Sequence, residues 1–279
     1  MIAFVGSVFS PYYAFAQRRD PRADPQRFCA LNVSLYGSRR RWAMTEHGRH
    51  GVVREADALS IGRSLVRWEN DALVIDIDEF TAPLPRRLRG QVRVHPHALT
   101  GHGVELDAAG LHRWRPIAPS ARVEVSLEQP DLSWSGAGYL DSNDGDGPLA
   151  ASFRRWDWAR APLRDATGIV YDVTDRNGVD RPVALHIDRK GGVEQRASPA
   201  LVTLPRTAWR LPRFTRADPG HSAQVARTLQ DSPFYARSMV DTHLFGEATQ
   251  AMHESLDLDR FSNPLTQMML PFRIPRALA

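Results

Sequence analysis

Apolar and polar residues alternate with a period of two along much of the chain. Three aliphatic residues alternate with polar ones over 73–78, and three more do so over 122–127. This alternation is typical of strands that bury one face and expose the other to water. Pro and Gly, with 20 and 19 residues, suit many turns between short strands. The pattern therefore predicts an all-β fold built from short antiparallel strands, a sandwich or a barrel.

Turn sequences separate these predicted strands. Asn177-Gly178 lies between two apolar runs, 169–173 and 183–187, and predicts a hairpin whose loop is longer than two residues. Pro130-Asp131 follows the strand that ends at Gln129 and should break its hydrogen-bond ladder. We place a domain boundary there, which gives domains of residues 1–129 and 130–279.

Helical periodicity is thin before residue 220. The segments 221–237 and 247–261 are the best helix candidates, and Pro233 interrupts the region between them. The sequence thus predicts a short helical portion near the C-terminus of an otherwise β protein.

Charge and cysteine content narrow the function classes. The chain has 36 basic and 32 acidic residues, which are interleaved, and its net charge is +4. Arg39-Arg40-Arg41 is the one concentrated basic run, so a solvated surface is favoured over nucleic-acid binding. A weak attraction to anionic lipid headgroups stays open. Cys29 is the sole cysteine, in an apolar stretch, which favours a buried thiol over a nucleophile.

The N-terminal segment resembles a signal peptide only in part. Ala14-Phe15-Ala16 mimics a cleavage site, but no basic segment precedes it and Ser10-Pro11-Tyr12-Tyr13 interrupts the apolar stretch. No apolar run approaches the ~20 residues that span a bilayer. We predict a strand followed by a turn, no signal peptide and a cytoplasmic protein.

Two short pairs carry the candidate chemistry. His112 and Trp114 form one pair, and Tyr139 and Asp141 form the other. In strands, residues i and i+2 share a face, so each pair sets an acid–base group beside an aromatic ring. A carboxyl in an apolar site stays protonated at neutral pH and can protonate an alkene. Aromatic faces then stabilise the cation, and an imidazole can hold and deprotonate water.

Structural interpretations compete with this chemistry. Asp141-Ser142-Asn143-Asp144-Gly145 is also a good turn sequence, in which Asp commonly caps the turn. His112 and Trp114 are equally well explained as a core pair, and Tyr139 as a buried aromatic. From the residues alone, these structural interpretations are preferred over the catalytic one. The same acidic segment fails the EF-hand calcium pattern, and the histidines at 95, 97 and 102 lack zinc-like partners.

The segments GSVFSPYYAFAQRR, LHRWRPIAP, GYLDSNDG, HESLDLDRF and MLPFRIPR span nearly the whole chain. In them the sequence resembles the acyclic carotenoid 1,2-hydratases, also called hydroxyneurosporene synthases. The resemblance implies two tandem lipocalin-like antiparallel β-barrels with a short helical C-terminal portion. It implies a cofactor-free hydro-lyase of carotenoid biosynthesis that adds water to the terminal C1–C2 double bond of neurosporene, lycopene or their derivatives. It also implies that His112, Trp114, Tyr139 and Asp141 are catalytic.

The resemblance extends to substrate contacts and location. Trp156 and Trp158, at i and i+2, are expected to face one side and line the substrate channel, and Tyr12 and Tyr13 are further candidates for substrate contact or docking. His253-Glu254-Ser255 belongs to a C-terminal motif of the family, with a structural role expected first and cavity lining second. The substrate lives in the membrane, so the protein is expected at the surface of the inner, photosynthetic membrane.

Two other functions stay open. A lipocalin-like carrier would bind a carotenoid or another isoprenoid without changing it, and a related polyene cyclase would fold its substrate in a shaped cavity. The Tyr-x-Asp match favours hydration over both. Relatives usually carry an aromatic-rich strand before GSVFSPYY, so we expect the chain to lack its first strand.

Overall fold

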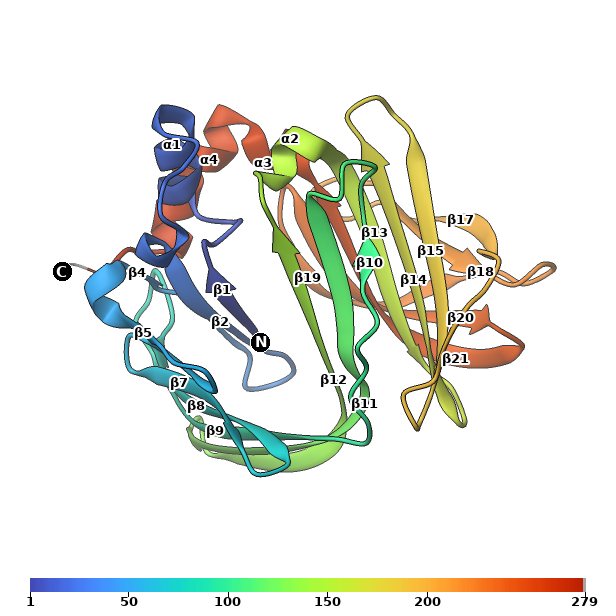
Figure 1. Cartoon of the computed structure of the whole chain (residues 1–279), viewed down its shortest axis with the longest axis horizontal. Coiled ribbons are helices and arrows are strands. Elements are labelled where there is room, and N and C mark those ends of the chain that lie inside the picture. The colour runs from blue at the N-terminus through green and yellow to red at the C-terminus, as the bar shows by residue number, and fades with distance from the viewer. Residues whose placement is uncertain (278–279) are drawn as a thin grey trace. The chain divides into compact units, whose positions relative to one another are not determined.

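The structure is a computed structural model that describes residues 1–277. Strands make up 56% of it and helices 12%, in large antiparallel sheets (Figure 1). The predicted all-β class is confirmed. Within residues 1–277, no helix combines the length and the apolar character that crossing a bilayer requires.

The chain divides into two compact units. Unit 1 holds residues 1–96, 122–138 and the segment from Pro264 onward, and unit 2 holds residues 97–121 and 139–263. Two long strands, β11 (His112–Gln129) and β12 (Leu132–Gly145), contribute to both units and pair with each other. The predicted break at Pro130 is confirmed as the turn between them. Division at this turn into domains 1–129 and 130–279 stays a prediction.

Unit 1 contains antiparallel strands and two helices that pack together. Strands β9, β8, β7, β6 and β5 are neighbours in that order, β11 joins beside β9, and β1, β2 and β3 form a separate sheet to which β4 adds. Its remaining elements are β1 (Ile2–Val5), α1 (Pro11–Arg19), a 3-10 turn (Pro25–Arg27), β2 (Cys29–Leu35), β3 (Arg41–Ala43), β4 (Glu46–His47), a second 3-10 turn (Arg49–Gly51), β5 (Val52–Arg54), β6 (Ala58–Ile61), β7 (Ser64–Glu69), β8 (Ala72–Phe80), β9 (Arg87–Pro96) and α4 (Pro264–Arg273).

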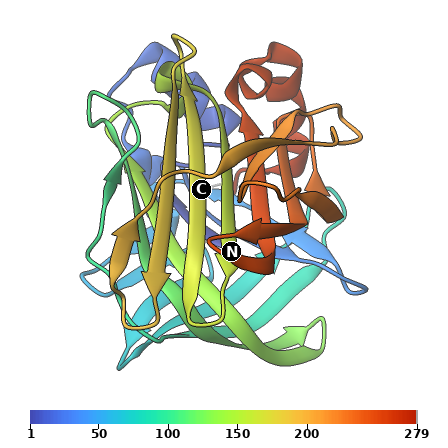
Figure 2. The ribbon, with the colours of Figure 1, turned by 90° about the vertical axis from the view of Figure 1, so that its right-hand side faces the viewer.

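Unit 2 is built on one seven-stranded antiparallel sheet in the order β16-β15-β14-β13-β21-β20-β19. The predicted hairpin at Asn177-Gly178 is confirmed as the turn between β14 and β15, two long adjacent strands in yellow in Figure 2. Its elements are β10 (Val104–Glu105), α2 (Leu149–Ser152), β13 (Phe153–Pro162), β14 (Ala166–Asp175), β15 (Asp180–Asp188), β16 (Val193–Gln195), β17 (Ala200–Leu204), β18 (Arg213–Ala217), β19 (Gln224–Asp231), β20 (Tyr235–Leu244), β21 (Glu247–Asp257) and α3 (Leu258–Ser262).

The helices predicted at 221–237 and 247–261 are wrong. These segments form β19, the start of β20 and β21, and only the short α3 at the end of the second is helical. β20 and β21 are paired along the whole length of β20. The energy of this non-local pairing and its burial outweighs a weak local helical periodicity.

The N-terminal turn is the start of a helix. The predicted strand is confirmed as β1, and Ser10 then caps α1 by accepting a hydrogen bond from the Tyr13 backbone N–H at 2.9 Å. Pro11 occupies the first helical position, where its missing N–H costs nothing. The sequence Ser10-Pro11-Tyr12-Tyr13 therefore interrupts the apolar stretch by beginning a helix.

Candidate active site

The carboxyl group of Asp141 joins three of the four predicted catalytic residues. The indole Nε1–H of Trp114 on β11 donates to Asp141 Oδ2 at 2.8 Å, and the Tyr139 hydroxyl donates to the same oxygen at 3.1 Å. Asp141 lies inside strand β12, so the alternative that it caps a turn is wrong. Within residues 1–277, Asp141 Oδ1 accepts no hydrogen bond and Asp141 forms no ion pair. A protonated Asp141 would thus carry its proton on Oδ1, with Oδ2 as the double acceptor.

Burial raises the pKa of Asp141 to about 6. The hydrogen bond from Trp114 opposes this shift, the charge of Glu254 adds to it, and the hydrogen bond from Tyr139 opposes it. At pH 7 a carboxyl with this pKa is protonated in about a tenth of molecules, against about a thousandth for an unperturbed Asp. The site therefore keeps a usable population of neutral acid.

Aromatic rings surround this carboxyl. Trp114 is fully buried and meets the ring of Tyr171 edge-on, with centroids 5.5 Å apart. Tyr171 also meets Trp156 at 6.2 Å, and Tyr139 meets Trp158 at 5.4 Å. Both tryptophans of the predicted pair therefore contact rings of this group from one side of β13.

Tyr171 was not among the predicted site residues. The apolar run 169–173 gave a signal for its strand, but all of 167–171 is buried, so periodicity gives no preferred face. Its position follows from the pairing of β13 with β14, in which Tyr171 is the direct partner of Trp158. Cross-strand partners have their Cβ atoms about 5 Å apart.

A second carboxyl lies on the same row of the sheet. Glu254 on β21 is the direct partner of Trp158 on β13 and of Arg237 on β20. Arg237 Nη2 and Glu254 Oε1 form an ion pair of 2.5 Å, with both side chains largely buried. The sequence signal for Glu254 was the motif His253-Glu254-Ser255, for which we expected a structural role first.

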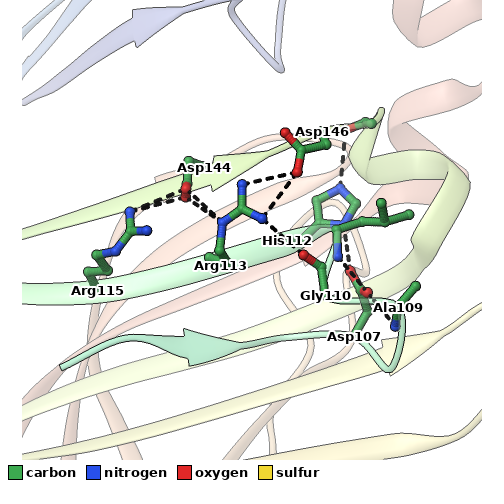
Figure 3. A network of polar contacts seen from close by, with 10 residues as sticks. Asp107, Ala109, Gly110, His112, Arg113, Arg115, Asp144 and Asp146 are labelled. Carbon is green, nitrogen blue, oxygen red and sulfur yellow. Dashed lines mark hydrogen bonds and ion pairs between the residues drawn. The ribbon is translucent and has the colours of Figure 1, made fainter.

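His112 is held separately from Asp141. Its Nδ1 lies 2.7 Å from the Asp107 carboxylate and its Nε2 lies 3.1 Å from the Gly147 carbonyl oxygen (Figure 3). Both partners are hydrogen-bond acceptors, so neither ring nitrogen is directed at a water or a substrate. The pKa of Asp107 is lowered: burial opposes this, but hydrogen bonds from the Leu111 N–H and from His112 outweigh it.

An ion-pair network continues from His112 along the same two strands. Arg113, next on β11, binds Asp144 on β12 at 3.1 Å and Asp146 beyond it at 3.1 Å, and Arg115 reaches Asp144 at 3.2 Å (Figure 3). These pairs point away from the Trp114 face, because alternate residues of a strand face opposite sides. They join the same two strands that bring Trp114 to Asp141.

A second buried polar cluster lies on the other face of β13 and β21. Asp157 Oδ1 accepts hydrogen bonds from the Phe214 backbone N–H at 3.1 Å and from the Ser255 hydroxyl. His253 Nε2 donates to the Phe214 carbonyl oxygen at 2.7 Å. Burial raises the pKa of Asp157 to about 7 and lowers that of His253 to about 4. His253 and Ser255 thus help to hold β18 on the sheet, the structural role expected of them.

Tyr12 and Tyr13 lie in α1 of unit 1. Tyr13 stacks on Phe28 with centroids 4.9 Å apart, and the Arg276 guanidinium lies 5.7 Å from the ring of Tyr12. These contacts are sufficient to explain both rings as packing residues. Contact of either tyrosine with substrate stays a prediction.

Comparisons with known proteins agree on one family. The family model described as "Carotenoid hydratase CrtC" matches residues 1–279. The acyclic carotenoid 1,2-hydratase of Thiocapsa roseopersicina is 51% identical over 278 residues, which cover 99% of this chain and 68% of that protein. The acyclic carotenoid 1,2-hydratase of Cereibacter sphaeroides is 39% identical over 277 residues, covering 99% and 98%. These relatives fit the resemblance seen in the sequence.

Solved structures support the fold. A protein of Nitrosomonas europaea, whose crystal structure was described as that of an AttH, aligns with a TM-score of 0.59 at 12% identity. The alignment covers 82% of this chain and 80% of that one. At this identity the likeness concerns the fold alone, which is lipocalin-like as expected.

Proposed function

We propose a reaction for this chain, which belongs to the carotenoid hydratase family. It adds water across the C1–C2 double bond at the end of an acyclic carotenoid. The observation that carries this proposal is the raised pKa of Asp141, whose Oδ2 accepts two hydrogen bonds while Oδ1 accepts none among the described residues. Hydration needs a neutral acid beside electron-rich rings, and these residues supply both.

The first step is transfer of the Oδ1 proton of Asp141 to C2 of the substrate. The C1–C2 π electrons form the new C–H bond, C1 becomes a tertiary cation, and Asp141 becomes a carboxylate. The hydrogen bonds from Trp114 and Tyr139 to Oδ2 stabilise that carboxylate as it forms. They therefore act mainly in the transition state, where an interaction accelerates the reaction.

The second step is capture of the cation by water. The faces of nearby rings, among them Trp114 and Tyr139, stabilise the cation by roughly 0.5–2 kcal/mol per contact. Water adds to C1 and loses a proton, giving a tertiary alcohol. The reaction moves only protons and water, so the proposed steps require no redox or group-carrying cofactor.

His112 takes a positioning role in this proposal. Deprotonating water requires a ring nitrogen with a free lone pair, and both nitrogens face acceptors at Asp107 and Gly147. The imidazole instead anchors the beginning of β11, two residues before Trp114. Its removal would loosen the indole that holds Asp141.

Conversion with isotopically labelled water tests the activity. We expect the purified chain, given neurosporene or lycopene in liposomes, to produce a carotenoid heavier by one water, and by two further mass units in H₂¹⁸O. Bound but unchanged pigment would instead identify a carrier. A product of unchanged mass with a new ring would identify a cyclase.

We also propose that the protein docks on the inner membrane surface through an apolar stripe on α4. Leu265, Met268, Met269 and Phe272 recur at i, i+3, i+4 and i+7 and are 50–76% exposed. α1 packs beside α4 (Figure 1), exposes Phe15 and ends in Arg18 and Arg19. Apolar side chains flanked by arginines suit an anionic bilayer.

Liposome flotation tests the docking surface. The wild type should float with anionic vesicles. A Leu265→Ser, Phe272→Ser double variant should bind the vesicles with at least about tenfold lower affinity, because two large apolar groups no longer enter the lipid. The exposed Leu84→Ser is the control in unit 1. Unchanged flotation of the double variant would contradict the proposal, and so would a dimer in light scattering that dissociates on the same substitutions.

A further inference from the structure

Four side chains from adjacent strands form one row across the sheet of unit 2. Tyr171 on β14, Trp158 on β13, Glu254 on β21 and Arg237 on β20 are successive direct partners in the antiparallel register. Direct partners in antiparallel strands point to the same face. This face contacts the Asp141 group, because Tyr171 meets Trp114 and Trp158 meets Tyr139. Glu254 therefore lies on the side of the sheet where the proposed chemistry takes place.

The site holds two carboxyls and gives them different partners. Glu254 has the guanidinium of Arg237 at 2.5 Å, whereas no cation of residues 1–277 pairs with Asp141. Burial raises the pKa of Asp141, and the negative charge of Glu254 raises it further. The two carboxyls therefore differ in their surroundings: a guanidinium lies beside Glu254, and two aromatic donors bind Asp141. The charge of Arg237 in turn lowers the pKa of Asp141, but the net shift is upward.

Water capture needs a proton acceptor, and His112 is not placed to be that acceptor. His112 has both ring nitrogens occupied by acceptors. The indole Nε1–H of Trp158 is buried and donates to no acceptor within residues 1–277. A buried N–H without a partner costs free energy, and an ordered water is the usual way to satisfy it.

We propose that Glu254 is the general base of the hydration, taking the proton from a water that is held between its carboxylate and the indole N–H of Trp158. This inference rests on the proposed function. The water oxygen bonds to C1 of the cation while one of its protons passes to Glu254. Return of that proton through solvent to the Asp141 carboxylate restores both groups, so atoms and charge balance over the cycle.

Hydrogen exchange at C2 distinguishes the capture of water from the protonation of the alkene. In D₂O, Asp141 delivers deuterium to C2, and a cation that is not captured returns to alkene by losing a C2 proton to the Asp141 carboxylate. We expect Glu254→Gln in the full chain to lower lycopene hydration about 100-fold, the usual range for a lost general base. The recovered lycopene should still gain deuterium. Glu247→Gln, the same change at the other end of β21, should hydrate like the wild type.

Trp158→Phe is the second variant, because it keeps an aromatic ring beside Tyr139 and removes the N–H together with part of the indole. We expect hydration about tenfold slower with exchange retained. Full hydration by folded Glu254→Gln would overturn the proposal, and so would loss of exchange together with hydration, since Glu254 would then act before the cation forms. A wild type that shows neither hydration nor exchange would remove the proposed function itself, and this proposal with it.

Discussion

Asp141 on β12 and Asp157 on β13 are two carboxyls of unit 2 that differ in what their oxygens contact. Asp157 binds a backbone N–H of β18 and a hydroxyl, both of which belong to the fold. Asp141 Oδ2 accepts its two hydrogen bonds from aromatic side chains, Trp114 and Tyr139. Burial raises the pKa of both groups. A raised pKa and a carboxyl oxygen that accepts no hydrogen bond from residues 1–277 are common to both groups, so neither feature distinguishes catalysis from structure. The partners do distinguish them: they are aromatic side chains at Asp141, and a backbone N–H and a hydroxyl at Asp157.

The largest expected effect is the loss of hydration activity when the Asp141 carboxyl is replaced. Asp141→Asn should lower hydration at least 1000-fold, because the amide cannot donate a proton to an alkene, and should leave the thermal midpoint within a few degrees. Product formation by mass spectrometry and a melting curve measure these effects. Asp131→Asn, in the exposed turn before β12, is the control. Hydration by Asp141→Asn at the wild-type rate would remove Asp141 as the acid.

Asp157→Ala should show the reverse pattern. It leaves the Phe214 N–H and the Ser255 hydroxyl without an acceptor, so the free energy of unfolding should fall by about 1–3 kcal/mol. Urea unfolding measures the change, and the rate per folded molecule should stay near the wild-type value. Asp241→Ala, at an exposed position on β20, should cost less. If Asp157→Ala lost activity while its stability stayed unchanged, the structural role assigned to Asp157 would be contradicted.

The pH dependence should differ between activity and stability. Hydration requires neutral Asp141, so its rate should fall about tenfold per pH unit above about 6. The raised pKa of folded Asp157, about 7 against about 4 when unfolded, contributes stability below pH 4 that is lost as pH rises toward 7. Asp157→Asn should flatten this loss without moving the activity profile. If the pH profile of activity moved in Asp157→Asn, Asp157 would contribute to activity as well as to stability, against the roles assigned to the two carboxyls.

The smallest expected effect is a shift in that activity profile. The Trp114 hydrogen bond lowers the pKa of Asp141, so Trp114→Phe should move the alkaline limb to higher pH by up to about one unit. An aromatic ring is kept at this position, so the maximal rate should fall only about tenfold. Trp134→Phe, an exposed position on β12, should shift nothing. A limb that moves to lower pH would show that Trp114 does not stabilise the carboxylate.

Much of the fold follows from local patterns. The alternation over 73–78 and 122–127 lies in β8 and β11, and Asn177-Gly178 turns between β14 and β15. Short-range rules suffice here because a strand with one wet face must alternate and a tight turn needs residues that tolerate positive φ. The short helical C-terminal portion is present as α3 and α4. The helices expected over 221–237 and 247–261 failed because non-local strand pairing overrode a weak local preference.

The sequence by itself determined which side chains can share a face: Trp114 with His112, Asp141 with Tyr139, and Trp158 with Trp156. Spacing along a strand fixes this, because successive side chains alternate. Only the tertiary structure decided that Trp114 and Tyr139 meet on one oxygen of Asp141, and that Glu254 faces this group while His253 and Ser255 face β18. Contacts between strands depend on register, and register is set by pairing of residues far apart in the chain.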